Sequence, residues 1–340
     1  MNCYDIAVVG ATGAVGTAML EILAERKFPV GNVYALASER SARKRVCFDN
    51  TELQVESLAR FDFSKAQIGL FSAGSKVSAE YAPQAAAAGC VVIDNTSCFR
   101  YEPAVPLVVP EVNPETIGEY RHRGIIANPN CSTIQLVVAL KPLYDAVGIE
   151  RVNVATYQSV SGAGARAIEE LAHQTMLLLN GDPIEATARF VKQIAFNALP
   201  HIDEFQDNGY TREEMKMVWE TQKILGDERL QVNATAVRVP VFYGHSEAVH
   251  LETREKLTAD EARTLLRRAP GVEVLDERRP GGYPTAATEA AHKDAVFVGR
   301  IREDISHPRG LDLWVVADNL RKGGALNSVQ LAELLIEQWC

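Results

Sequence analysis

The first third of the chain alternates short apolar runs rich in β-formers with segments of helical pattern, and this alternation limits the possible folds. The candidate strands are DIAVVG, NVYALAS, IGLFSAG, CVVIDNT, PLVVPEVN and GIIANP, and the candidate helices lie near 14–26 and 76–88. Strands separated by helices of this length form βαβ units in a parallel sheet, which binds ligands at the carboxyl ends of its strands. We therefore expect an α/β domain with ligand contacts from the residues that follow the strands, namely Ser72, Ala73, Gly74 and Asn95.

The first strand runs into VVGATGAVGTAMLEIL, where three glycines are spaced G-x-x-G-x-x-G before a helix. Such glycines permit a tight turn and the close approach of a pyrophosphate, which the N-terminal end of the helix attracts. The pattern alone is also compatible with a structural turn, but its place between a strand and a helix favours a Rossmann-type dinucleotide-binding domain. The expected cofactor contacts here are Gly10, Thr12, Gly13, Ala14, Val15 and Gly16.

The end of the second strand indicates which dinucleotide is bound. An NAD site usually carries an acidic residue about 20 residues after the glycines to hold the ribose 2′-hydroxyl. Here the strand ends in LASERSARK, where Ser38, Arg40 and Ser41 offer hydroxyl groups and a guanidinium that suit a 2′-phosphate. We therefore predict NADP, although Glu39 argues against it and a solvated charged loop is the alternative reading.

Beyond residue 131 the pattern changes to a long helix near 132–146, a strand RVNVATYQSV, a helix near 164–179 and strands at 230–241 and 246–254. This order predicts an α+β domain with a largely antiparallel sheet, inserted into the first domain. The last segment carries apolar residues on one helical stripe, which predicts a helix that returns to the first domain. The expected domains are 1–127 with 318–340, and 128–317.

Composition excludes several classes of function. The 340 residues carry a net charge of −9 with acidic and basic residues intermixed, which argues against nucleic-acid binding and against a basic membrane patch. No apolar run reaches the ~20 residues of a membrane span, and the chain opens without a basic leader, so we expect a cytoplasmic protein. The expected partners are small molecules and copies of the same chain.

Six cysteines are scattered along the chain without the spacing of a disulfide framework or a zinc site, so no metal is expected. Only Cys131, in ANPNCSTIQLVVAL, stands at the start of a predicted helix. The helix dipole lowers the pKa of a thiol in that position, although a buried structural cysteine is the plainer alternative. A thiolate together with a nicotinamide cofactor would suit aldehyde oxidation through an enzyme thioester.

Several motifs resemble, in order and spacing, those of the aspartate-β-semialdehyde dehydrogenases. They are GATGAVG, SAGSKVS, DNTSCFR, VPEVN, NPNCSTIQ, YQSVSGAG, YTREEMKMVWETQKI, VRVPVFYGHSE and LWVVADNLRKGGALNSVQ, and they span essentially the whole chain. The chain departs from the family pattern at Cys98 and Gly324, where alanine is more usual. Both changes are small in volume, and neither falls on a matched catalytic position.

The resemblance implies a role for each matched residue. Cys131 resembles the family nucleophile, His245 its acid/base partner and Gln158 the residue that orients the acyl intermediate. Arg238 would clamp the substrate carboxylate, Glu213 would hold its amino group, and Lys216 and Arg100 would bind phosphate. Further cofactor contacts are implied at Ser161, Gly162, Ala163, Gly164 and Asn319. From its position beside the thiol, Asn130 could donate to an oxyanion.

Seven residues separate Arg238 from His245, which would place them on opposite faces of one unbroken strand. Pro240 and Gly244 make such a strand unfavourable, so we expect a bend that directs both side chains to one site.

Together with these features, the resemblance implies an NADP-dependent dehydrogenase that interconverts L-4-aspartyl phosphate and L-aspartate 4-semialdehyde, in lysine, threonine and methionine biosynthesis. A homodimer is implied by the resemblance. The alternatives are a related acyl-phosphate reductase, such as N-acetyl-γ-glutamyl-phosphate reductase, and a catalytically silent relative that acts as a binding partner. The pair Glu213 and Arg238 favours a free amino acid, which offers both an ammonium and a carboxylate.

Overall fold

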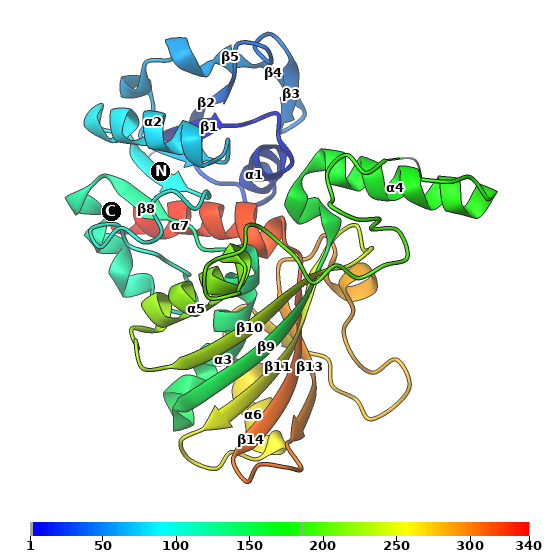
Figure 1. The fold of residues 1–340 in the computed structure, drawn as a ribbon. Helices are drawn as coiled ribbons and strands as arrows, with labels where there is room; N and C mark the ends of the chain where they lie inside the picture. The colour runs from blue at the N-terminus through cyan, green and yellow to red at the C-terminus, as the bar shows by residue number, and fades with distance from the viewer. Residues whose placement is uncertain (1–2, 185, 340) are drawn as a thin grey trace. The chain divides into compact units, whose positions relative to one another are not determined.

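Figure 1 shows the computed structural model of the chain, which describes residues 3–184 and 186–339. The chain divides into two compact units. One comprises the residues up to Asn130 together with those from Gly324 onward, and the other comprises Cys131–Gly323. Among the described residues, no helix combines the length and the apolar character needed to cross a membrane.

The first unit is built on a six-stranded sheet, counted over the described residues, in which every pairing is parallel. The strands in sheet order are β5 (Glu56–Ser57), β2 (Val30–Ala37), β1 (Tyr4–Val9), β6 (Ile68–Phe71), β7 (Val91–Asp94) and β8 (Ile125–Ala127). If only the six strands of this sheet are numbered, in the order in which they occur in the sequence, their order in the sheet is 3-2-1-4-5-6, which is the order of a Rossmann fold. The predicted Rossmann-type domain is therefore confirmed, and the point where the order reverses lies between β1 and β6.

Three α-helices accompany this sheet in the described residues: α1 (Ala14–Glu25), α2 (Ser75–Ala87) and α7 (Leu326–Glu337). Smaller elements are the hairpin β3 (Arg45–Phe48) and β4 (Thr51–Gln54) and the short helices η1 (Leu58–Arg60), η2 (Phe63–Lys65) and η3 (Pro114–His122). Helix α7 packs against α1, and its buried Leu331 and Leu335 share one hydrophobic core with residues of β1. The predicted return of the C-terminal helix to the first domain is confirmed.

The run PLVVPEVN was expected to form a strand, and this prediction is wrong. Only Leu107 makes a bridge, to Ala127. The Asn113 side chain accepts from the Val109 N–H at 2.9 Å and donates to the Leu107 carbonyl at 2.9 Å, which folds the segment back on itself. Proline also removes the backbone donor at Pro106 and Pro110, so a regular ladder could not continue there.

The second unit contains a six-stranded sheet, again counted over the described residues. Its strands in sheet order are β10 (Gln231–Arg238), β9 (Ile149–Gln158), β11 (His245–Thr253), β14 (Gly310–Ala317), β13 (Val296–Glu303) and β12 (Val272–Val274). The three central pairings are antiparallel and the two outer pairings are parallel. The sheet that was expected to be largely antiparallel is therefore mixed.

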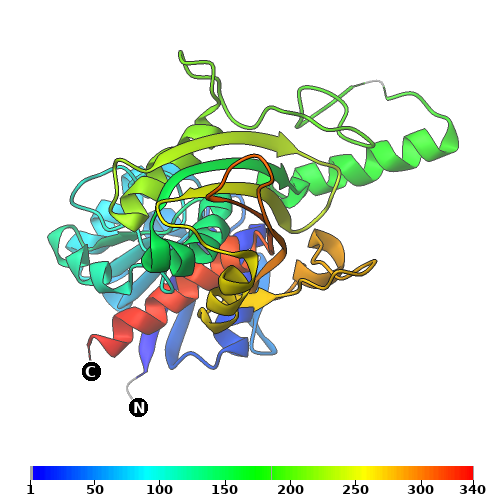
Figure 2. The ribbon, with the colours of Figure 1, turned by 90° about the horizontal axis from the view of Figure 1, so that it is seen from below.

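Helices cover one face of this mixed sheet. The helices of the unit are α3 (Cys131–Val147), α4 (Ala165–Asn180), α5 (Arg212–Leu225) and α6 (Ala259–Arg268), with the shorter η4 (Val160–Ala163) and η5 (Ala286–Ala290). The short helix η6 (Arg321–Ala325) contains the boundary between the two units. Helix α3 lies against the central strands and is flanked by α5 and α6. Helix α4 projects away from the sheet, as the two views show (Figure 1, Figure 2). Side chains that point from the strands toward α3 are therefore enclosed.

Candidate active site

The loop after β1 has the close packing that only glycines allow. Gly10 has φ +91°, and a Cβ there would lie 3.0 Å from the Ala73 nitrogen and from the Ser72 hydroxyl. A Cβ on Gly16 would lie 2.2 Å from the Gly10 carbonyl oxygen, so α1 starts in direct contact with the loop. The Gly13 N–H donates to the same oxygen at 2.9 Å. The loop therefore leaves the start of α1 open to a phosphate group.

A pocket of about 540 Å³ lies at this switch point. The residues that line it are Gly10, Thr12, Gly13, Ala37, Ser38, Glu39, Ser41, Leu58, Ala59, Ser72, Ala73, Val77, Glu80 and Tyr81. Seven of the expected cofactor contacts are among them: Gly10, Thr12, Gly13, Ser38, Ser41, Ser72 and Ala73. Ala14, Val15 and Gly16 follow in the first turn of α1, and Gly74 precedes α2 with φ +95°.

Two charged residues shortly after β2, Glu39 and Arg40, differ in their relation to this pocket. Arg40 is exposed and is not one of the lining residues. Glu39 lines the pocket, accepts from the Ser57 hydroxyl at 2.8 Å and pairs with Arg60 at 3.0 Å. The carboxylate that argued against a 2′-phosphate is therefore neutralised in part by a neighbouring guanidinium.

Asn95 and Arg100 belong to a buried network at the end of β7. The Asn128 amide donates to Asn95 Oδ1 at 2.6 Å, and the Arg100 guanidinium donates to the Asn95 carbonyl at 3.0 Å. Asp94 accepts from Ser78 and from the Thr96 hydroxyl at 2.7 and 2.8 Å. Burial raises the pKa of the Asp94 carboxyl, and the bonds to Ser78 and Thr96 oppose this shift. Asn95 therefore has a structural role in addition to any contact with a cofactor.

Cys131 is the first residue of α3, as the sequence predicted. It is partly accessible, whereas the residues that follow it in α3, from Ser132 to Leu140, are buried. A Cβ on Gly323 would lie 2.7 Å from the Cys131 Cβ, so only a glycine fits opposite the thiol. Asn130, which precedes it, is buried. The described cysteines are free thiols, and burial raises the pKa of Cys90 to about 12 and also raises that of Cys98.

The strand order brings Gln158, Arg238 and His245 together. Gln158 ends β9, Arg238 ends β10 as its register partner, and His245 begins β11 on the other side of β9. Because β11 is antiparallel to β9, its first residue lies at the same edge of the sheet. The predicted bend is present: residues 239–244 connect two separate strands, and Gly244 has φ +84°. A Cβ on Gly162 would lie 3.2 Å from Arg238 Nη1 and 3.4 Å from His245 Cε1.

His245 is fully buried, and its ring is held by the residue that follows Gln158. The Ser159 N–H donates to Nδ1 at 3.1 Å, so the neutral ring carries its proton on Nε2. In this tautomer, the 3.4 Å approach of Gln158 Nε2 to His245 Nε2 joins two donors and is not a hydrogen bond. Burial and then the nearby Arg238 charge lower the pKa of His245 to about 3. The imidazole is therefore neutral at neutral pH, with Nε2–H as its donor.

Arg238 is buried beside these residues. Its guanidinium donates to the Ser159 carbonyl at 2.7 Å. Burial lowers the pKa of Arg238, while the negative charges of Glu213 and then of Cys131 oppose this shift. Arg238 is thus close enough to both groups for their charges to interact, and it offers a buried cation to an anionic ligand.

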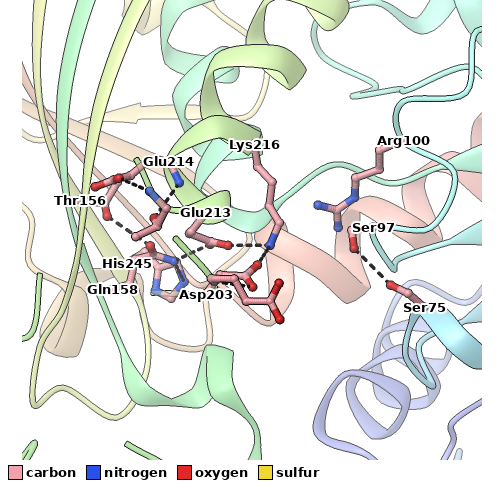
Figure 3. A network of polar contacts seen from close by, with 12 residues as sticks. Ser75, Ser97, Arg100, Thr156, Gln158, Asp203, Glu213, Glu214, Lys216 and His245 are labelled. Atoms are coloured by element: carbon pink, nitrogen blue, oxygen red, sulfur yellow. Dashed lines mark hydrogen bonds and ion pairs between the residues drawn. The ribbon is translucent and has the colours of Figure 1, made fainter. Parts of the chain in front are cut away.

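Glu213 and Lys216 share one face of α5 and form a buried ion pair of 2.9 Å (Figure 3). Lys216 also donates to Asp203 at 2.7 Å, and the Gln158 amide donates to Glu213 at 3.2 Å. Burial alone would lower the pKa of Lys216, but Glu213 and Asp203 together raise it. The chain of contacts runs from Asp203 to Gln158, so Glu213 is oriented from two sides.

Asn319 is expected to contact a cofactor, and its side chain already has several partners. Its Oδ1 accepts from the Ser159 hydroxyl at 3.0 Å, the Ser161 hydroxyl at 3.1 Å and the Gly244 N–H at 2.9 Å. This one amide ties together the segments that follow β9, precede β11 and follow β14. Asn319 therefore supports the loops around His245.

Three participants were not found from the sequence: Ser159, Asp203 and Glu247. Ser159 acts on His245 through its backbone N–H, which no residue pattern reveals. Asp203 lies in a loop with φ +71°, thirteen residues before Lys216, and gave no motif signal. Glu247 stands within the motif VRVPVFYGHSE, but the motif indicated no role of its own for it, and it is completely buried.

Comparison with known proteins gives consistent matches over both units. Residues 5–120 match the model of the semialdehyde dehydrogenase NAD binding domain, and residues 140–322 match that of the semialdehyde dehydrogenase dimerisation domain. An aspartate-semialdehyde dehydrogenase of Legionella pneumophila is 64% identical, over 97% of this chain and 95% of its own length. One from Aquifex aeolicus is 54% identical, over 98% of each.

Solved structures of the same family also match this chain. The crystal structure of aspartate semialdehyde dehydrogenase II from Vibrio cholerae, complexed with ASA, matches with a TM-score of 0.98 and 58% identity over the whole of both chains. The NADP complex of the enzyme from Candida albicans matches with a TM-score of 0.75 and 26% identity, over 98% of each chain. The resemblance noted in the sequence is therefore confirmed.

Proposed function

Because the chain belongs to the aspartate-semialdehyde dehydrogenase family, we propose that it converts L-4-aspartyl phosphate into L-aspartate 4-semialdehyde and phosphate, reversibly, through a thioester on Cys131 and with NADP as cofactor. The observation that carries the proposal is the grouping of Gln158, Arg238 and His245 at one edge of a sheet, with Arg238 within electrostatic range of Cys131. The pathways served are those of lysine, with diaminopimelate as an intermediate, threonine and methionine.

In this proposal Cys131 is the nucleophile. The start of α3 favours a thiolate, and the positive charge of Arg238 has the same effect. The sulfur attacks the acyl carbon, a C–S bond forms, and the C–O bond to phosphate breaks with its electron pair on the departing phosphate. Asn130 and the Cys131 N–H stabilise the oxyanion that forms during this step.

His245 is the acid/base group that faces the substrate oxygen. Because Ser159 occupies Nδ1, the proton available for donation lies on Nε2. A neutral imidazole donor can stabilise an oxyanion without first taking a proton from water, so it can act throughout the neutral pH range. When the hemithioacetal collapses, the C–S bond breaks and Cys131 leaves as thiolate. Gln158 orients the acyl group beside the imidazole.

Substrate selection is assigned to Arg238 and Glu213. A buried guanidinium suits the α-carboxylate, and a buried carboxylate oriented by Gln158 and Lys216 suits the α-ammonium. An N-acetylated substrate lacks the ammonium and would leave Glu213 without that partner. This pairing favours an aspartyl substrate over the N-acetylglutamyl alternative. Lys216 and Arg100 are assigned to phosphate.

The residues at the glycine loop fit a dinucleotide. A Cβ on Gly10 or Gly16 would lie too close to neighbouring backbone atoms, so the loop has no room for a side chain at these positions. Without side chains there, a pyrophosphate can approach the loop closely, and Ser38 and Ser41 line the adjoining pocket. Arg40 and these hydroxyls are the groups assigned to a 2′-phosphate, and Asn319, Ser161 and Gly162 to the nicotinamide half. When bound, NADPH supplies the hydride that reduces the thioester. The proposal further includes a homodimer, which the dimerisation-domain match supports, and a cytoplasmic location.

The test follows NADPH formation from L-aspartate 4-semialdehyde and phosphate with purified protein. Turnover should require phosphate, fall by at least about a thousandfold in Cys131→Ser, and stay within about twofold of wild type in the matched thiol control Cys98→Ser. NAD in place of NADP measures the cofactor preference. Phosphate-dependent turnover that survives in Cys131→Ser would overturn the thioester. Turnover only with the N-acetylglutamyl substrate would replace the substrate assignment, and binding without any turnover would indicate a silent relative.

A further inference from the structure

Glu247 is a buried carboxyl group that the reaction above does not use. It lies in β11 two residues after His245, so both side chains point to the same face of the sheet, toward α3. Its exposed fraction is 0%. Neither carboxyl oxygen has a hydrogen-bond partner within the described part of the chain. An ionised group in this position would be very unfavourable, because nothing replaces its lost hydration.

The neighbouring side chain on α3 is Gln135, one helical turn after Cys131 and also completely buried. Its Nε2 donates to the His245 carbonyl oxygen at 3.4 Å. Its Oε1 has no partner among the described atoms. Gln135 therefore connects the helix that begins with Cys131 to the backbone of His245, and its acceptor is left over.

The two orphan groups are complementary. Gln135 reaches the backbone of β11 two residues before Glu247, and both side chains are completely buried where α3 contacts β11. Burial raises the pKa of the Glu247 carboxyl well above its usual range, and Gln135 opposes this shift. A protonated carboxyl has one O–H donor, and Gln135 Oε1 is an open acceptor. An ionised carboxyl would instead attract Gln135 Nε2 and pull it away from the His245 carbonyl.

We propose that Glu247 is a positioning residue for the active site: as a neutral acid it donates a hydrogen bond to Gln135 Oε1 and so keeps Gln135 Nε2 on the carbonyl of His245. This bond holds the start of α3, which carries Cys131, in register with the start of β11, which carries His245. A neutral group at this place also adds no negative charge beside the thiolate and the imidazole, whose pKa values a carboxylate would raise. The inference rests on the proposed roles of Cys131 and His245.

The test compares Glu247→Gln with Glu247→Leu. Glutamine keeps the shape and the neutral charge of the protonated acid and offers an N–H donor to Gln135 Oε1. Leucine fills a similar volume but has no donor. The matched control is Glu252→Gln, on the same strand but on its other face and partly exposed. Glu247→Gln and Glu252→Gln should keep kcat and KM within about twofold, and Glu247→Leu should lower kcat about tenfold with little change in KM, as expected when a group that aligns reacting residues is lost.

Two readouts do not depend on turnover and therefore separate this inference from the proposed function. The infrared spectrum of wild type should contain a protonated-carboxyl band that is absent in Glu247→Gln and present in Glu252→Gln. The pH profile of Cys131 alkylation should match wild type in Glu247→Gln and be displaced in Glu247→Leu. If Glu247→Leu does not fold, the glutamine variant and its infrared spectrum decide. The inference is overturned if that band is unchanged in Glu247→Gln, if Glu247→Gln is impaired, or if folded Glu247→Leu behaves like wild type.

Discussion

The backbone N–H of Ser159 donates to Nδ1 of His245 across 3.1 Å, and this bond determines which ring nitrogen carries the proton. It is available because Ser159 directly follows β9, beside the first residue of β11. The donor is a main-chain group, so only a substitution of Ser159 by proline would remove the donor itself. The acid/base behaviour assigned to His245 is thus built into the pairing of two strands.

The depressed pKa of His245 predicts a specific pH dependence of stability. The unfolded histidine takes up a proton near pH 6.5, whereas the buried ring does so only near pH 3. Between these values the unfolded state binds more protons, so the free energy of unfolding rises with pH and is fully recovered above about pH 7. His245→Gln removes this contribution. Between pH 6.5 and 5 its unfolding free energy should fall less steeply than that of wild type, by up to roughly 1.4 kcal/mol per pH unit.

Urea unfolding at several pH values measures this slope, with the exposed His122→Gln as control. The control should follow wild type. Equal slopes for wild type and His245→Gln would show that the ring is protonated in the folded protein well above pH 3. Imidazole NMR gives an independent check, because the His245 signals should not titrate between pH 5 and 8.

The glycine loop predicts a graded response to alanine. In Gly16→Ala the new Cβ would lie 2.2 Å from the Gly10 carbonyl oxygen, which is backbone and cannot move aside cheaply. We expect a loss of roughly 1–3 kcal/mol in stability and at least tenfold weaker NADPH binding. Gly13→Ala is the milder partner, because its Cβ would lie 3.3 Å from the same oxygen. Calorimetric titration with NADPH would contradict this reading if the two variants bound equally well.

Sequence reasoning succeeded where one local pattern decides one element. The strand and helix alternation predicted the parallel sheet, and the apolar stripe of the last segment predicted a helix whose Leu331 and Leu335 lie in the first core. The order of β10, β9 and β11 explains why Arg238 and His245 reach one edge in spite of their odd spacing. The hairpin β3–β4 was not predicted, although its turn residues Asp49 and Asn50 are typical of positive φ.

Sequence reasoning failed where the local structure depends on contacts between distant residues. The run PLVVPEVN has the composition of a strand, but Asn113 bonds back to Leu107 and Val109 and prevents it. Lys216 also donates to Asp203 from a loop thirteen residues earlier, and no motif indicated this partner. No spacing rule predicts that a glutamate in a strand, Glu247, will be completely buried without an ion-pair partner among the described residues.

Asp203 is predicted to control how Glu213 is shared between Lys216 and the substrate. In Asp203→Asn the ammonium loses one of its two carboxylates, so Lys216 should bind Glu213 more strongly and compete with the substrate amino group. We expect KM for aspartate semialdehyde to rise about three- to tenfold while kcat changes less than about twofold, since the substrate amino group is held equally in the ground state and the transition state. The exposed Asp207→Asn in the same loop region is the control. A fall in kcat with constant KM would instead assign Asp203 to the chemical step.

Cofactor preference should depend on the balance between Arg40 and Glu39. Arg40 is exposed and free to reach a 2′-phosphate at the pocket rim, so Arg40→Ala should weaken NADPH binding by about 1.5–3 kcal/mol and leave NADH binding within about twofold. Glu39 accepts from Ser57 and pairs with Arg60, and its carboxylate would repel the phosphate. Glu39→Gln should therefore raise the ratio of kcat/KM for NADP over NAD by several-fold, because it removes a negative charge without changing shape. Arg43→Ala, in the same loop, is the control for general loss of positive charge. If Arg40→Ala weakened both cofactors equally, the 2′-phosphate assignment would be wrong and Arg40 would contact a part of the dinucleotide that both share.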